Sequence, residues 1–240
     1  MSGGGGPVIP NFGSGSHCVT HNDLFCTDWI RDNWSSVLQP ALVQHIELTA
    51  KAVAIGFGIA FVAAVAARRL RFVETPFSLF SAFVYTIPSL ALFQLLIPIT
   101  GLTDTTVEVA LVGYTLLILF RNTLAGFRGV PEDVLESARG MGLTGLQMLW
   151  RIELPLALPS IVAGIRIAVV STISLATIAA FVRPVGLGEP IFIAIGNDIF
   201  KTELIAAGAL AVALALAADG VLVLVQRVLT PWTRARARTA

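Results

Sequence analysis

Long apolar segments separated by short polar loops constrain this chain more than any other feature. A helix needs about 20 apolar residues to cross the ~30 Å hydrocarbon core of a bilayer. Candidate spans cover roughly residues 46–67, 76–100, 106–120, 156–182 and 204–229. Only 13% of the residues are charged, against about 25% in soluble domains. We therefore expect an all-α polytopic membrane protein with a five-helix transmembrane core spanning residues 46–230.

Basic residues fall on one side of this five-span scheme. They follow span one at Arg68, Arg69 and Arg71, lie between spans three and four, and recur in the tail 231–240. The opposite loops, 101–105 and 183–203, hold few of them. Because Lys and Arg in short loops stay in the cytoplasm, we expect an outer N-terminus, an inner C-terminus and a basic cytoplasmic tail.

Residues 1–45 precede the first span and should lie outside the cell. The first 16 residues have neither the basic nor the apolar region of a secretory signal. Further on, apolar side chains recur at helical spacing, which predicts an amphipathic interfacial helix between Asp23 and Gln44 with tryptophan anchors. Its apolar positions are Trp29, Ile30, Trp34, Val37, Leu38 and Ala41. Pro40 is expected to separate this helix from the first span.

Two cysteines, Cys18 and Cys26, lie in this outer tail. An oxidising exterior favours a disulfide between them. Two free thiols, or a zinc site that adds His17 and His21, are the alternatives. The tail lacks the paired Cys-x2-Cys knuckle of zinc sites, so no metal is expected.

Proline residues interrupt the second span. Pro88 removes a backbone donor and should kink the helix, either as simple packing or to bend polar residues into a translocation path. That path would be lined by Tyr85, Thr86, Pro88 and Ser89. Phe80, Phe83 and Tyr85 have two interpretations. They could form a weak site for a quaternary ammonium group, or they could simply pack against neighbouring helices.

Two charges lie within apolar runs, Arg166 in span four and Asp219 in span five. Since an ionised group facing lipid is costly, both should face protein or water, and they could pair with each other. Snorkelling of Arg166 to the headgroups is the alternative. Small residues in span five allow close approach of a second subunit: Ala206, Ala207, Gly208 and Ala209.

The coupling loop, residues 121–155, joins spans three and four. Pro131 followed by two acidic residues is typical of a helix start, and Gly140 and Gly142 should end that helix. A capping-box pattern from Thr144 to Gln147 predicts a second helix. Its apolar stripe would be Leu146, Leu149 and Trp150, with Pro155 as its end. The pair is either a knob that docks into a partner's groove or a surface loop packed on its own bundle.

The spacing of residues in this loop is similar to the EAA motif of type I ABC importer permeases. The matching positions are Glu136, Ser137, Ala138, Gly142, Ile152, Leu154 and Pro155, with Ser137 as the one departure from the family pattern. The resemblance implies that these residues couple the chain to a cytosolic ATPase. It also implies a bacterial inner-membrane location.

Stretches elsewhere in residues 40–230 resemble the permeases of osmoprotectant importers for glycine betaine, carnitine or choline. They are 85–91, 96–101, 163–166 and 176–181, whereas 183–188 agrees with the family only at its last three positions. The resemblance implies a translocation path formed with a second permease, identical or paralogous. Two ATPases would act from the cytosol and a substrate-binding protein from outside.

Competing functions remain on sequence grounds. The chain lacks the Gly-Lys-Ser/Thr of a P-loop, so ATP and Mg would be bound by the partner ATPase, with no cofactor on this chain. The alternatives are an importer for an amino acid such as methionine, or a channel or scaffold without ATP coupling. An intramembrane hydrolase is disfavoured, because the three histidines lie outside or at the outer edge. The net charge gives no indication of nucleic-acid binding.

Overall fold

The computed structural model describes residues 17–197 and 199–231. These residues form helices and no strands, which confirms the all-α class. The predictions for residues 1–16 and the basic tail lie largely outside this part. The elements are α1 (His17–Thr20), α2 (Thr27–Asp32), η1 (Trp34–Leu38), α3 (Gln39–Ala67), α4 (Arg71–Thr86), α5 (Ser89–Thr100), α6 (Asp104–Arg128), α7 (Glu132–Gly140), α8 (Gly145–Met148), η2 (Leu149–Glu153), α9 (Leu154–Ala179), α10 (Gly188–Gly196) and α11 (Lys201–Leu229).

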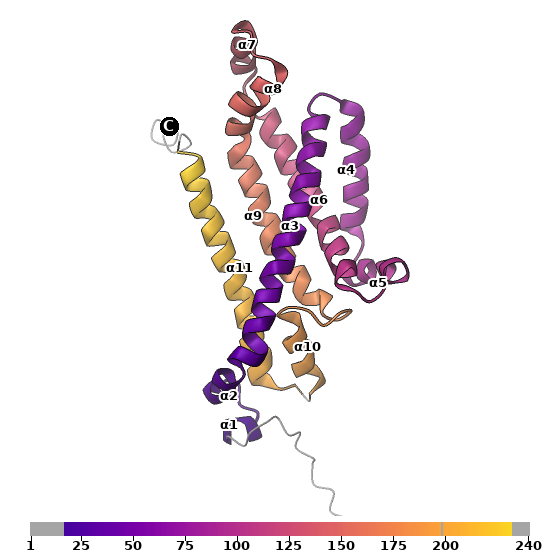
Figure 1. Ribbon diagram of the computed structural model, residues 1–240, viewed down its shortest axis with the longest axis vertical. Coiled ribbons are helices and arrows are strands. Elements are labelled where there is room, and N and C mark those ends of the chain that lie inside the picture. Colours follow the sequence, from indigo (N-terminus) through magenta and orange to yellow (C-terminus); the bar gives the residue numbers. More distant parts are fainter. Residues whose placement is uncertain (1–16, 198, 232–240) are drawn as a thin grey trace, which may run out of the picture.

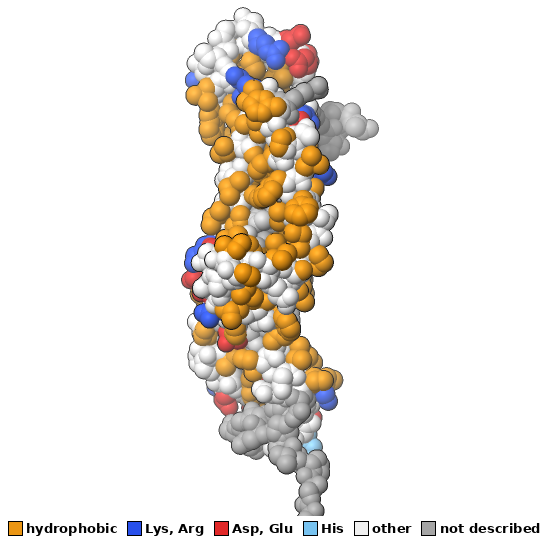
Figure 2. Space-filling model, turned by 90° about the vertical axis from the view of Figure 1, so that its right-hand side faces the viewer, with side chains coloured by type: hydrophobic (Ala, Val, Ile, Leu, Met, Phe, Trp, Pro, Cys, Tyr) orange, Lys and Arg blue, Asp and Glu red, His pale blue; other side chains and the backbone are white. Residues whose placement is uncertain are grey.

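An elongated bundle of long helices forms the body of the molecule (Figure 1). Four helical stretches of the described chain are long and apolar enough to cross a membrane: Trp34–Ala67, Asp104–Arg128, Gly145–Ala179 and Lys201–Leu229. The pair α4 and α5 makes a fifth candidate. Hydrophobic side chains cover most of one long face, as expected of a surface that meets lipid (Figure 2).

Helix α6 is the centre of the bundle and packs most extensively against α3 and α9. Glycines permit the close approach on both sides. A Cβ atom at Gly56 of α3 would overlap the Thr115 side chain of α6, and one at Gly126 of α6 would lie 2.9 Å from the Ala157 carbonyl oxygen of α9. Small residues at helix contacts are the usual solution in membranes, where backbone proximity supplies the packing energy.

The second predicted span is not one helix, because the chain breaks at Ile87 and Pro88. The axes of α4 and α5 meet at 104°. Pro88 has no amide hydrogen and disfavours the α conformation of the residue before it, and Ile87 is extended at φ −68° and ψ 129°. The Tyr114 hydroxyl of α6 donates a hydrogen bond to the Ile87 carbonyl that the break leaves free.

Two prolines expected to end helices lie instead inside continuous helical stretches. The predicted break at Pro40 is wrong, since Trp34–Ala67 is one stretch. Pro155 likewise does not end the second coupling helix, since Gly145–Ala179 is continuous. Each proline lies just after a π-helical turn, η1 or η2. The wider turn accommodates a ring that would clash with the carbonyl four residues earlier.

Opposite the coupling loop, the N-terminal residues pack on the start of α11 and on α10 (Figure 1). We call this unit the N-terminal cap, residues 18–38, 188–197 and 199–207. Its hydrophobic cluster comprises Val19, Cys26, Trp29, Leu38, Ala194, Phe200, Ala206 and Ala207. Ala206 and Ala207 are therefore buried within the chain and are not free to form the subunit interface predicted for them.

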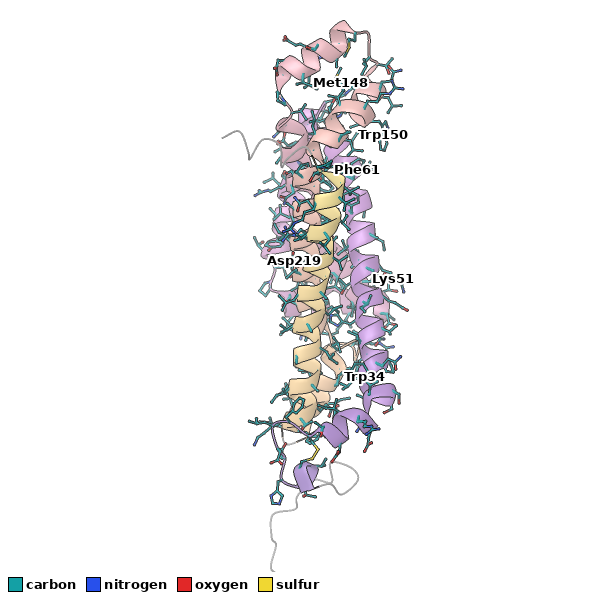
Figure 3. All side chains as sticks on the ribbon, turned by 90° about the vertical axis from the view of Figure 1, so that its left-hand side faces the viewer. Trp34, Lys51, Phe61, Met148, Trp150 and Asp219 are labelled. Carbon is teal, nitrogen blue, oxygen red and sulfur yellow. A yellow bond between two sulfur atoms is a disulfide. The ribbon has the colours of Figure 1, made fainter. Side chains whose placement is uncertain are left out.

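A disulfide joins Cys18 to Cys26 in the cap, with Cα atoms 5.7 Å apart (Figure 3). Because both sulfur atoms are in that bond, they are not available as zinc ligands. The described residues contain no group of three or more His, Cys, Asp or Glu side chains that could hold a metal ion.

The two intramembrane charges form an ion pair between α9 and α11. Arg166 donates from Nε and Nη2 to the two carboxylate oxygens of Asp219, at 2.8 and 3.0 Å. Gln226 extends the link by donating to the Pro159 carbonyl at 3.2 Å. The prediction that Arg166 and Asp219 pair is confirmed, and Figure 3 shows Asp219 near mid-height of α11. Each charge thus meets its partner rather than lipid.

Candidate functional site: the coupling foot and the helix-break pocket

The helices α7 and α8 with the turn η2 form a foot at one end of the bundle (Figure 1). Pro131 precedes α7, and Glu132 and Asp133 occupy its first turn, where carboxylates complement the positive end of the helix dipole. The helix ends in a Schellman motif: Leu143 N donates to Ala138 O at 3.2 Å and Gly142 N to Arg139 O at 2.9 Å.

Gly142 is the residue of this turn with left-handed backbone conformation. Its φ is +79°, in the left-handed region that glycine enters without steric cost. A Cβ atom there would meet nothing within 4 Å, so the requirement for glycine is conformational rather than spatial.

The second helix of the foot begins with the predicted capping box. The Thr144 hydroxyl accepts from the Gln147 amide at 3.4 Å, and the Gln147 side chain accepts from the Thr144 amide at 2.8 Å. This satisfies two of the amides that a helix start leaves without partners. The helix then runs on through η2 into α9, which joins the foot to a membrane-crossing helix without an intervening loop.

One ion pair holds the base of the foot against the end of α3, and a second joins α6 to α4 beside it. Arg68, at the end of α3, pairs with Glu153 in η2, and both side chains are 10% exposed. Arg128, at the end of α6, binds Glu74 of α4 through Nη1 at 2.8 Å. A buried pair of the first kind is strongly destabilising when one partner alone is removed, so η2 has a fixed position against α3.

Beyond these clamps, α7 has no extensive packing contact with any other helix of the described chain. A cavity of about 630 Å³ lies beneath it, lined in part by Arg69, Leu135, Arg139 and Met148. The alternative of a surface loop required α7 and α8 to pack against the bundle. The observed foot projects from the bundle instead, in a position where a partner can reach it.

The motif residues divide between the surface and the interior of the foot. Glu136, Ser137 and Gly142 are exposed, Ala138 is buried, and Ile152, Leu154 and Pro155 are half-buried. The Ser137 hydroxyl donates to the Asp133 carbonyl at 2.8 Å, so the departure from alanine leaves the helix intact.

The predicted apolar stripe of the second helix is wrong at one position. Leu149 packs into the bundle core, because the helix continues into the membrane and turns that face inward. Leu146 and Trp150 remain exposed at 66% and 55%, and Met141, which the sequence reasoning missed, is exposed at 71%. Figure 3 shows Trp150 at the foot end. Three large apolar side chains of the foot are thus left exposed by the described part of this chain.

A second site lies where α4 breaks from α5. A pocket of about 570 Å³ opens there between the break, α6 and α9. All four residues predicted for a translocation path line it, together with side chains that the sequence reasoning missed: Tyr114, Thr115, Ser171, Thr172 and Ser174. These are hydroxyl-bearing residues inside apolar spans, which is the one sequence signal that could have found them.

Aromatic rings and hydroxyls define the chemistry of this pocket. Tyr85 and Tyr114 meet edge to face with centroids 6.0 Å apart. None of the residues found to line it is charged. The predicted aromatic group is only partly assembled, because Phe80 and Phe83 are not among those lining residues. The pocket can hold a polar molecule of low net charge through hydroxyl groups and ring faces.

The stretch that departs most from the resemblance, 183–188, is held by α3. The Leu187 amide donates to Nδ1 of His45 at 3.1 Å. Nε2 therefore carries the ring proton and donates to the Ile173 carbonyl at 3.1 Å. Gln44 accepts from the Gly186 amide at 2.8 Å. These bonds fix the turn after α9 against the first span.

Residues 56–235 match the family described as "Binding-protein-dependent transport system inner membrane component". The chain belongs to this family. Membership confirms the resemblance found in the coupling loop and places the chain in the membrane as a transport component rather than a catalytic subunit.

Relatives with assigned roles are permeases. The chain is 38% identical over 189 residues to the glycine betaine/carnitine/choline transport system permease protein OpuCB of Bacillus subtilis, covering 78% of this chain and 86% of that protein. It is 42% identical over 149 residues to the choline transport system permease protein OpuBB of the same organism, covering 62% and 68%. Carnitine transport permease protein OpuCD of Listeria monocytogenes is 44% identical over 149 residues, covering 62% and 66%.

The fold agrees with a solved transporter. A chain of the MetNI methionine ABC transporter in inward-facing conformations superposes with a TM-score of 0.70 at 18% identity, covering 85% of this chain and 100% of that one. At this identity the likeness concerns the fold alone.

Proposed function

We propose that this chain is the membrane-spanning permease subunit of an ATP-driven importer of osmoprotectants such as glycine betaine, carnitine or choline. The observation that carries the proposal is the foot, whose residues follow the motif spacing of importer permeases and whose apolar tip is left uncovered by the described part of the chain. The names of the relatives support the substrate class.

The foot lies in the cytoplasm under this proposal, with the N-terminal cap outside the cell. Arginines support this orientation, since Arg68, Arg69, Arg128 and Arg151 gather at the foot end of the helices, as expected for cytoplasmic ends. The C-terminal end of α11 lies on the same side as the foot (Figure 1).

The partners follow from this arrangement. Two cytosolic ATPases bind ATP and Mg, and each receives the foot of one permease subunit in a groove, with Glu136, Met141, Leu146 and Trp150 as contacts. A second permease subunit completes the path, and a binding protein delivers substrate from outside. ATP binding then shifts the population between inward-open and outward-open states because the ATPases bind the foot differently in each.

The pocket at the helix break forms part of the translocation path in this proposal. Tyr85, Thr86, Pro88 and Ser89 present one wall, and hydroxyls of α6 and α9 present the others. A quaternary ammonium group is stabilised by aromatic faces and needs no carboxylate. The absence of charge from the pocket's observed lining suits a substrate that leaves without breaking an ion pair.

The test is reconstitution of the importer in proteoliposomes with its ATPase and binding protein. We expect ATP-dependent uptake of labelled glycine betaine, carnitine or choline and no uptake of methionine. Tyr85→Ala should reduce uptake of a quaternary ammonium substrate at least tenfold, whereas Phe80→Ala, outside the observed lining, should not. Uptake without the ATPase would contradict the coupling role, and uptake of methionine alone would contradict the substrate class.

A further inference from the structure

The N-terminal cap stands well outside the membrane in the proposed orientation. The stretch Trp34–Ala67 has 34 residues, or about 51 Å at 1.5 Å per residue, which exceeds the ~40–45 Å of a whole bilayer. With Arg68 at the inner boundary, Lys51 lies roughly 26 Å along the axis, near the outer edge of the hydrocarbon core. Lys51 is exposed and faces Glu47 across 4.0 Å, as befits a headgroup position (Figure 3). Trp34 lies roughly another 26 Å outward.

A disulfide hairpin at the far end of the cap is held rigidly. Besides the Cys18–Cys26 bond, Asn22 donates to the Ile199 carbonyl at 3.0 Å and accepts from the Lys201 amide at 2.9 Å. The Asp23 carbonyl accepts from the Thr202 hydroxyl at 2.8 Å. The hairpin is thus fixed to the start of α11.

This rigid hairpin presents two large apolar side chains to the exterior. Leu24 and Phe25 lie between the anchored Asp23 and the disulfide, and they are 64% and 63% exposed. The exposed carboxylates Asp23, Asp28 and Asp32 accompany them and outnumber the exposed cations nearby, which are Arg31 in the same segment and Lys201 beside Asn22.

The charge of the hairpin, residues 18–26, and its distance from the membrane indicate which kind of molecule could bind to Leu24 and Phe25. An anionic bilayer surface would repel this excess of carboxylates, and in the proposed orientation the hairpin lies beyond the headgroups. A folded partner protein could bind this surface if it has an apolar pocket for Leu24 and Phe25 and basic residues that face the carboxylates. Protein interfaces commonly combine a buried apolar anchor with a polar rim in this way. The matched family region begins at residue 56, so the hairpin is an addition to the shared transport domain.

We infer that Leu24 and Phe25, with their acidic surround, form a docking surface for the substrate-binding protein of the same importer. The inference rests on the proposed function and orientation. The disulfide keeps the two apolar side chains pre-organised, which reduces the entropy lost on docking. Docking there places the binding protein at the end of the molecule that is outermost in the proposed orientation.

Site-specific photo-crosslinking tests this surface in the complete importer in nanodiscs. Benzoylphenylalanine replaces Phe25 in one preparation and Val43, which is 48% exposed on α3 below the cap, in the control. With the importer's purified binding protein added, we expect an adduct to that protein from position 25 only. An adduct only to lipid, equal adducts from both positions, or none from position 25 would overturn the inference.

A second measurement separates this inference from the proposed function. Leu24→Ser with Phe25→Ser should raise the Kd for the binding protein at least tenfold, while ATPase activity without the binding protein stays unchanged. Val43→Ser should leave that Kd as it is. If the unmodified importer responds to the binding protein and the double variant responds equally, the docking surface is wrong. If the unmodified importer shows no response at all, the proposed function itself fails.

Discussion

The glycine at the turn of the foot provides the sharpest test of the coupling role. Gly142 and Gly140 both have room for a side chain, since a Cβ atom at either position would meet nothing within 4 Å. They differ in conformation, because Gly142 has φ +79° whereas Gly140 is the last residue of α7. Replacing each with alanine adds the same methyl group at both positions. Any difference between the two variants therefore reports the backbone conformation at the site.

The two alanine variants should have effects of opposite sign. An L-residue in the left-handed region costs roughly 1–2 kcal/mol, so Gly142→Ala should reduce the population of the native turn about 5- to 30-fold relative to its alternatives. Alanine in place of a helical glycine stabilises by roughly 0.5–1 kcal/mol, so Gly140→Ala should make α7 and the turn that follows it slightly more stable than in the unmodified chain. Gly142→Asn should lie between, because asparagine tolerates this conformation.

The assay is co-purification and coupled transport. In nanodiscs with the ATPase, Gly142→Ala should raise the Kd for the ATPase and slow substrate uptake per ATP hydrolysed, and Gly142→Asn should recover part of both. Thermal stability of the bundle should be unchanged, since the turn lies outside it. Equal behaviour of Gly142→Ala and Gly140→Ala would refute the conformational reasoning. Intact coupling in a Gly142→Val variant would refute the role of the foot.

Three further substitutions probe the bundle. Asp219→Arg should reduce the yield of folded protein and its Tm in detergent, because it places two cations opposite each other. The double variant Arg166→Asp with Asp219→Arg restores an ion pair with the charges exchanged, and it should restore both yield and Tm. If neither recovers, the loss of the ion pair is not the cause. Glu153→Gln should destabilise the foot by about 3–5 kcal/mol by leaving Arg68 buried without its partner, measured as faster hydrogen exchange over residues 145–153; unchanged exchange would contradict the clamp. Tyr114→Phe leaves a carbonyl unsatisfied at the α4–α5 break, at a cost of about 1–3 kcal/mol, and should slow uptake while ATPase binding is kept.

The transmembrane helices were predictable because hydropathy is a local property. Span five, expected at 204–229, is α11 from Lys201 to Leu229, and span four, expected at 156–182, is α9 from Leu154 to Ala179. The outer end of the first span was not predictable from sequence. Pro40 lies within the helix because a π turn precedes it, and that turn depends on how the helix packs in the folded chain. The 104° bend between α4 and α5 was likewise not predictable, because the Ile87 carbonyl at the break accepts a hydrogen bond from the Tyr114 hydroxyl of α6, 27 positions along the chain.

The candidate site was predictable only where its residues follow one another closely. The coupling motif and the capping box are short-range patterns and could be read directly. The clamp between Arg68 and Glu153 joins residues 85 positions apart, and the pocket is lined by residues of α4, α5, α6 and α9. In the same way, the burial of Ala206 and Ala207 reflects a cap whose other half begins near residue 18. Composition cannot distinguish a small residue packed within the chain from one that faces a partner.

One continuous helix connects the foot to the pocket, and this continuity limits how a signal can travel. The stretch Gly145–Ala179 starts in the foot and carries Ser171 and Ser174 of the pocket wall roughly 39 and 44 Å farther along its axis. Its most deformable point is the π turn η2, where the hydrogen bonding departs from the α pattern. The Arg68–Glu153 clamp holds that turn against α3. Under the proposed function, a push on α7 and α8 would therefore reach the pocket as a movement of α9 together with α3, because the clamp opposes bending of the foot alone.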